Sequence, residues 1–110
     1  MVKQGTIIKV NLNPRAGHER AGYRPAVVVS NDTFNAKTSM VIVCPITNTM
    51  NHFPLHVPLD ERTKTTGCIL CEHIRALDIE ARTYRVIEQI PDDILQQVIN
   101  IIFAEIDTPV

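Results

Sequence analysis

Alternating hydrophobic and polar positions, and short runs of β-branched residues, recur along most of this 110-residue chain. Clusters of Gly, Pro, Asn, Asp and Ser separate these stretches, as turns separate successive β-strands. The runs at 25–30 and 40–46 are apolar almost throughout, which is typical of central strands covered on both faces. Strands are expected over residues 6–12, 25–30, 40–46, 53–59, 67–74 and 84–90.

Residues 91–106 follow a helical pattern instead. Pro91 suits the first position of a helix, and Asp92 and Asp93 complement the positive end of its dipole. An apolar stripe repeats at helical spacing, at Leu95, Val98, Ile99, Ile102 and Ile106. Three further apolar residues fall outside the stripe, namely Ile94, Ile101 and Phe103. A helix that is apolar on more than one side needs a second partner, which indicates a homodimer.

These elements predict a mainly β protein, with a small, curled, barrel-like antiparallel sheet of five to seven strands and a C-terminal helix. One helical turn within 31–39 and a short helical stretch over 77–82 also fit the pattern. The length suits one domain over residues 1–110. No apolar run approaches the ~20 residues that cross a bilayer, and the first residues alternate, unlike a signal peptide. We therefore expect a cytoplasmic protein without membrane contact.

The three cysteines do not suit a disulfide framework. Cys68 and Cys71 form a C-x-x-C motif, but within a strand the two side chains would point to opposite faces. No further ligands stand at the spacing of a zinc site. We expect buried, apolar cysteines, no metal and no cofactor.

The net charge of −1 conceals an uneven distribution. Up to Arg85 the chain carries eleven basic and seven acidic residues, a net charge of +4. From Glu88 onward it carries five acidic residues and no basic one. The basic part of the chain, up to Arg85, would attract a polyanion. The alternative, which is equally plausible, is that a terminal helix carries excess acidic residues without any such partner.

The segment "RAGHERAGYRP", residues 15–25, is the first candidate for chemistry. Gly17 and Gly22 allow the connection between the first two strands to fold sharply. Pro25 holds Arg24 extended at the start of a core strand, and a rigid guanidinium suits phosphate recognition. The alternative is a structural ion pair between Arg24 and Glu19 across a hairpin.

Two later segments place polar residues at strand ends. "CPITNT" (44–49) contains Thr47, whose hydroxyl can donate to an oxyanion, although Thr and Asn are also common in turns. "CEHIRALD" (71–78) contains His73, which can exchange protons near neutral pH or be merely solvated. The chain has no G-x-S-x-G, H-E-x-x-H or phosphate-loop motif. Its arginines, histidines, threonines and carboxylates suit metal-free phosphodiester chemistry.

In this order, "RAGHERAGYRPAVVVSND", "CPITN", "TTGCILCEHIRALD" and "IPDDILQQV" resemble the MazF/PemK-like toxins of type II toxin–antitoxin modules, from about Gly5 to Ile106. The resemblance implies the plasmid-maintenance-toxin fold and a homodimer. It implies a sequence-specific endoribonuclease that cuts single-stranded mRNA without a metal, leaving 2′,3′-cyclic phosphate and 5′-OH ends. It also implies a small acidic antitoxin whose disordered tail blocks the site.

The resemblance assigns roles by position in these motifs. Arg24 matches the catalytic arginine, and Thr47 matches the threonine that binds the scissile phosphate. His18 matches a histidine that some members use as acid or base, and Glu19 matches a candidate base in the same loop. RNA contacts are expected from Asn31, Glu72, His73, Arg75 and Tyr23.

The chain departs from the family pattern at two places. Some members have Arg and Asp flanking the equivalent of Cys71, where this chain has Leu70 and Glu72. Arg24 and Thr47 must then carry more of the catalysis. Members often have Gln in place of His73, so base preference beside the cut should differ.

Two alternatives to the enzyme remain open. One is a non-catalytic toxin of the same fold that binds and poisons DNA gyrase. The other is a degenerate member that only binds RNA or an antitoxin. The presence of both Arg24 and Thr47 favours the enzyme over each.

Overall fold

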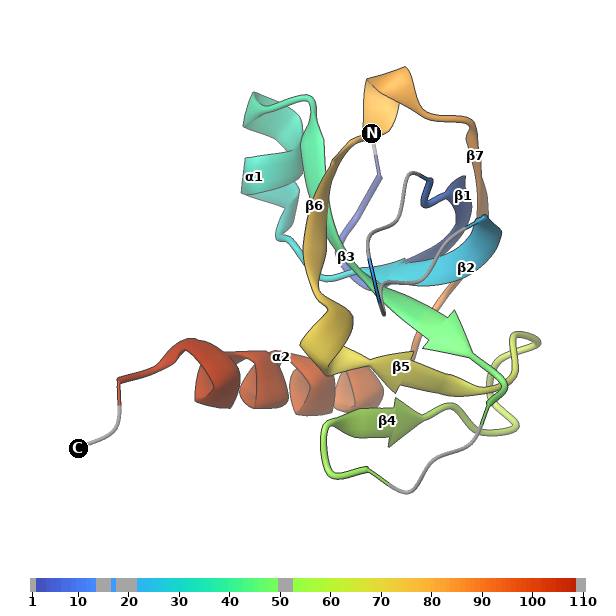
Figure 1. Cartoon of the computed structure of the whole chain (residues 1–110), viewed down its shortest axis with the longest axis vertical. Helices are drawn as coiled ribbons and strands as arrows, with labels where there is room; N and C mark the ends of the chain where they lie inside the picture. Colours follow the sequence, from blue (N-terminus) through green and yellow to red (C-terminus); the bar gives the residue numbers. More distant parts are fainter. Residues whose placement is uncertain (1, 14–16, 18–21, 50–52, 109–110) are drawn as a thin grey trace.

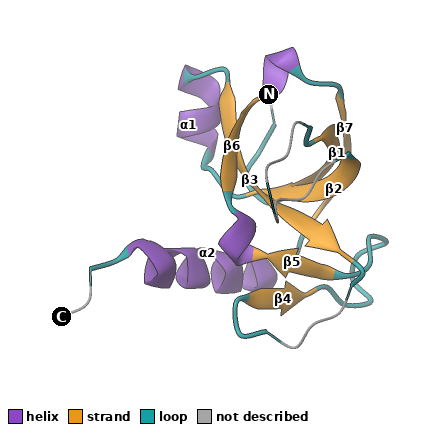
Figure 2. Cartoon of the chain, in the orientation of Figure 1, coloured by secondary structure: helices purple, strands orange, loops and turns teal. Residues whose placement is uncertain are grey.

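The computed structural model describes residues 2–13, 17, 22–49 and 53–108. Strands dominate these residues, and the two α-helices lie apart from each other (Figures 1 and 2). The elements in chain order are β1 (Thr6–Asn11), β2 (Tyr23–Val28), α1 (Asp32–Lys37), β3 (Met40–Thr47), β4 (His56–Pro58), β5 (Cys68–Leu70), η1 (Cys71–His73), β6 (Arg75–Asp78), η2 (Ile79–Ala81), β7 (Tyr84–Gln89) and α2 (Asp92–Ile106), where η denotes a 3-10 helix.

The seven strands form one antiparallel sheet in the order β4-β5-β3-β2-β1-β7, with β6 beside β3. The sheet curls strongly but does not close, since β4 and β7 stand at the two ends of this order (Figure 1). The prediction of a mainly β protein with five to seven strands and a C-terminal helix is confirmed.

Strand β3 changes its partner halfway along its length. Its first half pairs with β6, where Val43 faces Arg75, and its second half pairs with β5, where Ile46 faces Ile69. The register between these two pairings shifts by three residues, which are the residues of η1. Glu72 therefore lies in the 3-10 turn between β5 and β6 and does not pair with β3.

Two cores lie on the two faces of the sheet. The helix-side core contains residues of five strands and of α2, namely Ile7, Val27, Val29, Cys44, Ile46, Val57, Ile69, Cys71, Ile90, Ile94, Val98 and Ile102. The second core lies on the other face and contains Val2, Ile8, Val10, Leu12, Ala26, Val28, Val41, Val43 and Leu77. The alternation of strand side chains between faces produces both cores.

The apolar stripe of α2 is rotated relative to the prediction. Ile94, expected outside the stripe, is buried, whereas Ile106, expected within it, is 71% exposed. Figure 1 shows why, because the last turns of α2 extend beyond the sheet. The helix also begins at Asp92, with Pro91 as its N-cap rather than its first residue.

Three further predicted elements differ from the prediction in extent or type. The expected strand over 67–74 breaks at η1, and β6 follows as a strand that the sequence reading missed. The expected strand over 53–59 shortens to β4. The helical stretch expected over 77–82 is only the 3-10 turn η2, whereas the helical turn expected within 31–39 is present as α1.

Acidic residues hold the loop over residues 60–67 in place. The Arg62 guanidinium bonds both Asp60 and, 2.8 Å away, Asp93 at the start of α2. These bonds hold the pKa of both carboxyls below the usual range. Glu88 accepts hydrogen bonds from the backbone of Lys64 and from the backbone and hydroxyl of Thr65. The loop is thereby anchored to both β7 and α2.

No helix among the described residues is long and apolar enough to cross a membrane. The three cysteines are buried, as expected, and none of them forms a disulfide in the described part of the chain. Cys44 lies against Cys71 in the helix-side core, and their hydrogen bond together with burial raises the pKa of the Cys44 thiol. Thr47, not Cys71, lies opposite Cys68 in the ladder. The C-x-x-C motif therefore does not bring its two cysteines together in a site.

Candidate functional site

Arg24 and Thr47 lie across from each other on neighbouring strands. Strand β2 pairs with β3 so that Val28 faces Val43 and Ala26 faces Pro45. The same register, continued by two residues, places Arg24 opposite Thr47. Opposed residues project from the same face of a sheet, here the face of the second core. The two residues with the strongest predicted roles thus share one face.

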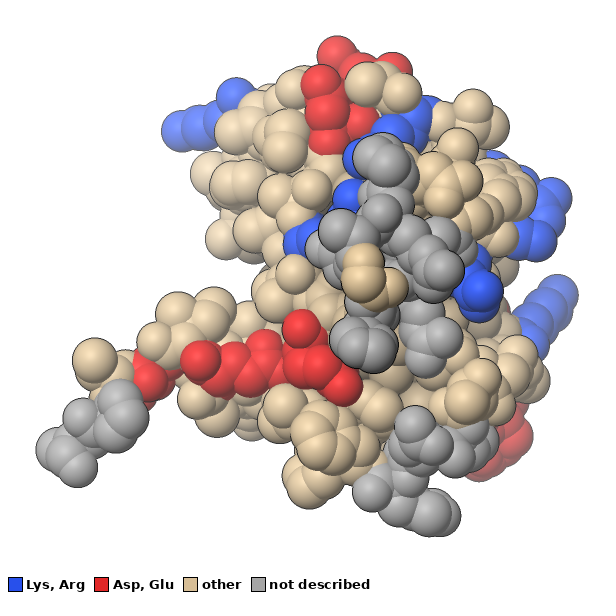
Figure 3. Space-filling view, viewed as in Figure 1, with Lys and Arg blue, Asp and Glu red and all other residues tan. Residues whose placement is uncertain are grey.

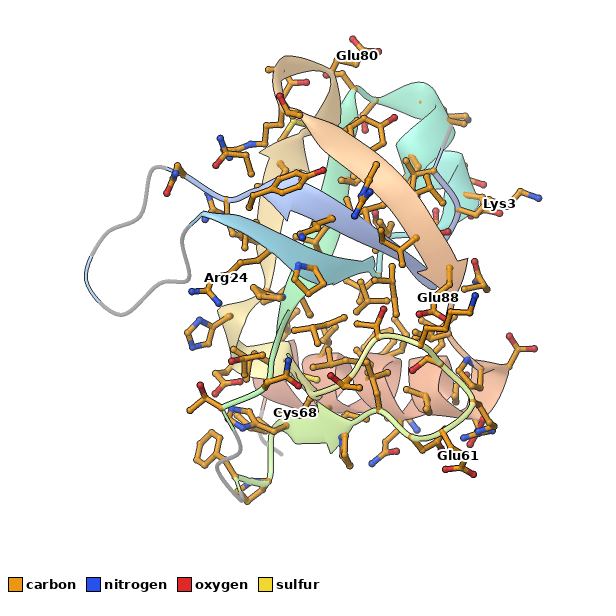
Figure 4. The ribbon with its side chains drawn as sticks, turned by 90° about the vertical axis from the view of Figure 1, so that its right-hand side faces the viewer. Lys3, Arg24, Glu61, Cys68, Glu80 and Glu88 are labelled. Carbon is orange, nitrogen blue, oxygen red and sulfur yellow. The ribbon has the colours of Figure 1, made fainter. Side chains whose placement is uncertain are left out.

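Arg24 is exposed at the beginning of β2, where the strand leaves the connection from β1. Figure 4 shows its side chain directed outward past the edge of the ribbon. Its cross-strand partner on β1 is Val10, which belongs to the second core. The backbone of Arg24 is therefore held by the sheet while its guanidinium reaches solvent.

Thr47 is buried at the end of β3, with 6% of its surface exposed. Its hydroxyl oxygen accepts a hydrogen bond from the backbone N–H of Thr49 at 3.1 Å. A hydroxyl that already accepts one bond keeps its own proton available to donate. Thr47 can therefore donate a hydrogen bond to an anionic oxygen.

Gly67 allows this end of β3 to approach the loop before β5. Its φ of +115° lies in the region that favours glycine, and a β-carbon there would collide with the Thr47 carbonyl oxygen. Beside it, the Thr66 hydroxyl donates to Asn48 Oδ1 at 2.9 Å. The sequence analysis placed Gly67 at the first position of the strand expected over 67–74 and did not connect it with Thr47.

Two further polar side chains lie on the same face, from β4 and β6. His56 on β4 stands across from Leu70, and its ring nitrogen Nε2 lies 2.7 Å from Glu72 Oε2. Arg75 on β6 donates to the Leu12 carbonyl at 3.1 Å. Of the predicted residues, Arg75 thus lies opposite Val43 on the same face, and Glu72 lies in η1 next to His56. His56 was not among the residues that the sequence analysis singled out.

The Arg82 side chain holds the base of the connection from β1 to β2. Arg82 donates to the carbonyls of Asn11 and Asn13 at 2.8 and 2.7 Å. The Asn13 side chain in turn accepts the backbone N–H of Gly22 at 3.0 Å. The predicted residues His18 and Glu19 belong to this connection but lie outside the described residues.

Three other predicted RNA contacts have separate positions. Asn31 lies at the far end of β2, where its side chain caps α1 by accepting the Phe34 N–H at 2.8 Å. Tyr23 alternates with Arg24 and so faces the other side of β2, where Lys9 Nζ lies 5.2 Å from the centre of its ring. His73 ends η1 and is half-buried. Asn31 and Tyr23 therefore do not join the Arg24–Thr47 face within one chain.

The charges on the surface are unevenly distributed. Figure 3 shows one group of acidic side chains along α2 and another at the top of the view, with basic side chains between them and on the right-hand side. Near the first group, burial and the Glu72 charge raise the pKa of Glu105. A strand of phosphates would therefore be favoured over the sheet and disfavoured along α2.

These groups can carry out a defined set of chemical tasks. The Arg24 guanidinium and the Thr47 hydroxyl supply donors on one face for an oxyanion. The described residues contain no cluster of histidine, cysteine or carboxylate ligands suited to a metal ion. The arrangement is suited to binding a phosphate group.

Comparisons with known proteins identify a family. The sequence profile of the PemK-like, MazF-like toxin of type II toxin–antitoxin system matches residues 3–104. Endoribonuclease PemK from Escherichia coli is 34% identical over 103 residues, spanning 90% of this chain and 77% of that protein.

Solved structures agree with this match. MazF (Form-I) from Deinococcus radiodurans aligns with a TM-score of 0.91 and 30% identity, covering 97% of both chains. A MazE-MazF structure (Form-II) from the same organism aligns at 0.85 and 30% identity, covering 98% of this chain and 97% of that one. A mycobacterial endoribonuclease in complex with its cognate antitoxin shares the fold, with a TM-score of 0.84, 17% identity and coverage of 100% and 99%.

Proposed function

The chain belongs to the PemK-like, MazF-like toxins of type II toxin–antitoxin systems, and we propose that it is an endoribonuclease that cuts single-stranded mRNA at specific sequences without a metal ion. Its relative from Escherichia coli bears the name of an endoribonuclease, which supports the activity. The opposition of Arg24 and Thr47 is the observation that carries the proposal, because it offers two phosphate donors on one face.

The reaction follows from what these donors can stabilise. The ribose 2′-OH attacks the neighbouring phosphorus, and the bond to the 5′-oxygen of the next nucleotide breaks. The products are a 2′,3′-cyclic phosphate and a 5′-OH, and the message is no longer translated. Negative charge grows on the phosphoryl oxygens during attack, so Arg24 and the Thr47 hydroxyl lower the barrier by binding them more strongly in the transition state.

Two protons must also move during the reaction. A base takes the proton of the 2′-OH, and an acid gives one to the leaving 5′-oxygen. His18 and Glu19, by family position, are proposed for these steps. Glu72, His73, Arg75, Asn31 and Tyr23 are proposed to contact the RNA on either side of the cut.

A homodimer is proposed from the uncovered face of α2. Phe103 and Ile106 are 66% and 71% exposed, and they border an apolar groove of about 620 Å³ that Ile42, Ile74 and Ile99 also line. Exposed apolar groups in such number are typical of a protein interface. The proposed occupant is the same face of a second copy, because a two-fold axis pairs identical surfaces.

A small acidic antitoxin is the second proposed protein partner. The solved MazE-MazF complex supports a partner of this kind. The net charge of +4 up to Arg85 would attract an acidic tail by the same field that attracts RNA. Messenger RNA and antitoxin would both be met in the cytoplasm.

Incubation of purified protein with mixed-sequence single-stranded RNA in EDTA tests the proposal. We expect fragments with 5′-OH ends, and their loss in the variants Arg24→Ala and Thr47→Ala. Lys37→Ala is the control, because Lys37 is an exposed basic residue at the end of α1, away from the β1, β2 and β7 part of the sheet. Intact RNA together with gyrase-dependent DNA damage would instead support the gyrase-binding alternative.

A further inference from the structure

Two positively charged side chains, Lys9 on β1 and Arg85 on β7, face each other in the register of the sheet. Cross-strand partners project from the same face, with their β-carbons about 4.5–5.5 Å apart, and like charges in this position destabilise a sheet. Lys9 is half-buried and Arg85 is exposed, and neither has a carboxylate partner within the described part of the chain. A bound anion would relieve their repulsion.

Tyr23 on β2 adds an aromatic ring to this pair of cations. Tyr23 is diagonal to Lys9, because it pairs with Asn11, two residues further along β1. Lys9 Nζ lies 5.2 Å from the centre of the ring, and 44% of Tyr23 remains exposed. Surfaces that bind single-stranded nucleic acid combine the same two elements, since cations hold the phosphates and aromatic rings stack on the bases. We call Lys9, Tyr23 and Arg85 the outer surface.

The outer surface is the part of its sheet face that is open to solvent. Ile7 and Val27, which precede Lys9 by two residues and follow Tyr23 by four, project from the same face and are buried in the helix-side core. Figure 3 shows basic side chains on the right-hand side, where Figure 1 labels β1, β2 and β7. The end of α2 projects from the left-hand side of Figure 1. The dimer face proposed on α2 therefore leaves the outer surface uncovered.

One carboxylate borders the outer surface. Glu88 follows Arg85 by three residues on β7 and accepts hydrogen bonds from the backbone of Lys64 and from the backbone and hydroxyl of Thr65. Its carboxylate is thus engaged by the loop over residues 60–67. It does not neutralise Lys9 or Arg85.

Tyr23 and Arg24 connect the outer surface to the candidate active site. Both lie at the beginning of β2, and adjacent residues of a strand point to opposite faces of the sheet. Arg24 shares one face with Thr47, whereas Tyr23 shares the other with Lys9. Figure 4 shows the Arg24 side chain directed past the edge of the ribbon. A nucleic acid strand that leaves the Arg24–Thr47 pair around the beginning of β2 therefore reaches the outer surface at the neighbouring residue.

We propose that Lys9, Tyr23 and Arg85 form a second RNA-binding surface, which holds a single-stranded segment beyond the bases next to the cut. Lys9 and Arg85 contact phosphates, and a base stacks on the Tyr23 ring. RNA is the occupant because it supplies both charge and stacking bases, whereas an acidic peptide tail supplies chiefly charge. This inference rests on the proposed ribonuclease function for its choice of RNA, and it extends the substrate from a short cleaved site to a longer single strand.

Two oligonucleotides test the proposal. One contains only a cleaved site with its neighbouring bases, and the other extends this site by about ten nucleotides on either side, a length within the range that single-strand binding surfaces occupy. For the wild type, the extended RNA should have the higher kcat/KM, through a lower KM. The double variant Lys9→Gln with Arg85→Gln should lose most of this advantage, and Tyr23→Leu should reduce it roughly fivefold. The control Lys37→Gln, at an exposed lysine that ends α1, should retain it.

Binding can be measured without cleavage. RNA with methylated 2′-hydroxyls lacks the nucleophile, and its affinity follows from fluorescence anisotropy. The slope of log Kd against log salt concentration should fall by about 0.7 for each cation removed by Lys9→Gln or Arg85→Gln. Lys37→Gln should leave the slope unchanged.

Thermal unfolding without RNA tests the repulsion between Lys9 and Arg85. At low salt Arg85→Gln should unfold at a higher temperature than the wild type, because the like-charge pair is gone. The difference should disappear at high salt, where the repulsion is screened. A lower unfolding temperature for Arg85→Gln at low salt would count against the proposal, because contacts within the fold would then account for this arginine.

Failure of this proposal and failure of the ribonuclease are distinguishable. A wild type that cleaves both oligonucleotides equally well, or a double variant that loses the same activity on both, overturns the second surface and leaves the ribonuclease intact. A wild type that binds the extended methylated RNA through Lys9 and Arg85 but cuts no RNA overturns the ribonuclease and leaves the second surface intact. Unchanged RNA binding by the double variant, together with loss of poly-glutamate binding, overturns RNA as the occupant.

Discussion

Gly67 packs directly against the backbone carbonyl of Thr47, so closely that a β-carbon at position 67 would lie 2.8 Å from the Thr47 carbonyl carbon. Gly67→Ala must therefore displace Thr47 or the loop, besides straining a φ of +115°. Backbone strain of this kind costs about 1–3 kcal/mol. We expect a lower free energy of unfolding in urea, and a larger loss in kcat than in KM.

Gly22→Ala is the comparison for this prediction. Gly22 also has a positive φ, +80°, but a β-carbon there would meet nothing within 4 Å. It should reproduce the loss of stability that comes from backbone strain, without the collision. Equal losses of stability in the two variants would show that the contact between Gly67 and Thr47 adds nothing to the strain.

Arg82 should control the connection that carries His18 and Glu19. Removal of its two hydrogen bonds, to Asn11 and Asn13, in Arg82→Ala should loosen the base of this connection. At about 1 kcal/mol per bond, amide exchange at Leu12 and Gly22 should accelerate by fivefold or more. Hydrogen exchange followed by NMR measures this, and unchanged rates would contradict the anchoring role.

Stability should fall in acid through Glu88. Burial opposes ionisation of Glu88, but hydrogen bonds from Thr65 and Lys64 outweigh it and lower the pKa of the carboxyl. Because the pKa of this carboxyl is lower in the folded protein than in the unfolded one, its ionisation stabilises the fold at pH values above the unfolded-state pKa. This stabilisation is lost as the pH falls through the folded-state pKa. The wild type should therefore exceed Glu88→Gln in stability near neutral pH and lose this advantage below about pH 4.

Urea unfolding of both proteins across this pH range checks the sign. Glu80→Gln serves as the control, because Glu80 is exposed and accepts none of these hydrogen bonds among the described contacts. An advantage of wild type over Glu88→Gln that grew toward acid would refute the assignment.

The outer face of α2 should determine the oligomeric state. Phe103→Lys replaces a 66% exposed aromatic residue with a charge, and it should yield a folded monomer by light scattering. Gln97→Lys, on an exposed polar position of the same helix, should leave a dimer. Ile102→Ala, by contrast, opens the helix-side core and should lower stability by about 2–4 kcal/mol. Identical masses for wild type and Phe103→Lys would argue against this interface.

Periodicity predicted much of the fold, and the misses have local causes. The strands around residues 6–12, 25–30 and 40–46 were recognisable because their side chains alternate between two buried faces. The η1 turn was invisible, because its three residues continue the apolar pattern of β5 and only the change of partner along β3 reveals it. Ile106 follows the helical stripe, yet α2 extends beyond the surface that the stripe would cover.

The site was predictable only in part for a similar reason. Arg24 and Thr47 stood out because each lies at a strand end, and the register of β2 and β3 brings them together. His56 did not, because its contact with Glu72 joins β4 to the η1 turn, which are separate in the sequence. Contacts of this kind depend on sheet order, which residue patterns alone do not specify.

The contribution of α2 to the helix-side core has a consequence for synthesis of the protein. Ile94, Val98 and Ile102 pack against strands made much earlier, including β1 and β2. On the ribosome, those strands leave the exit tunnel with one face uncovered until α2 has followed them. The sheet therefore gains its full helix-side core, and the protein its stable form, only after the residues of α2 have also left the ribosome.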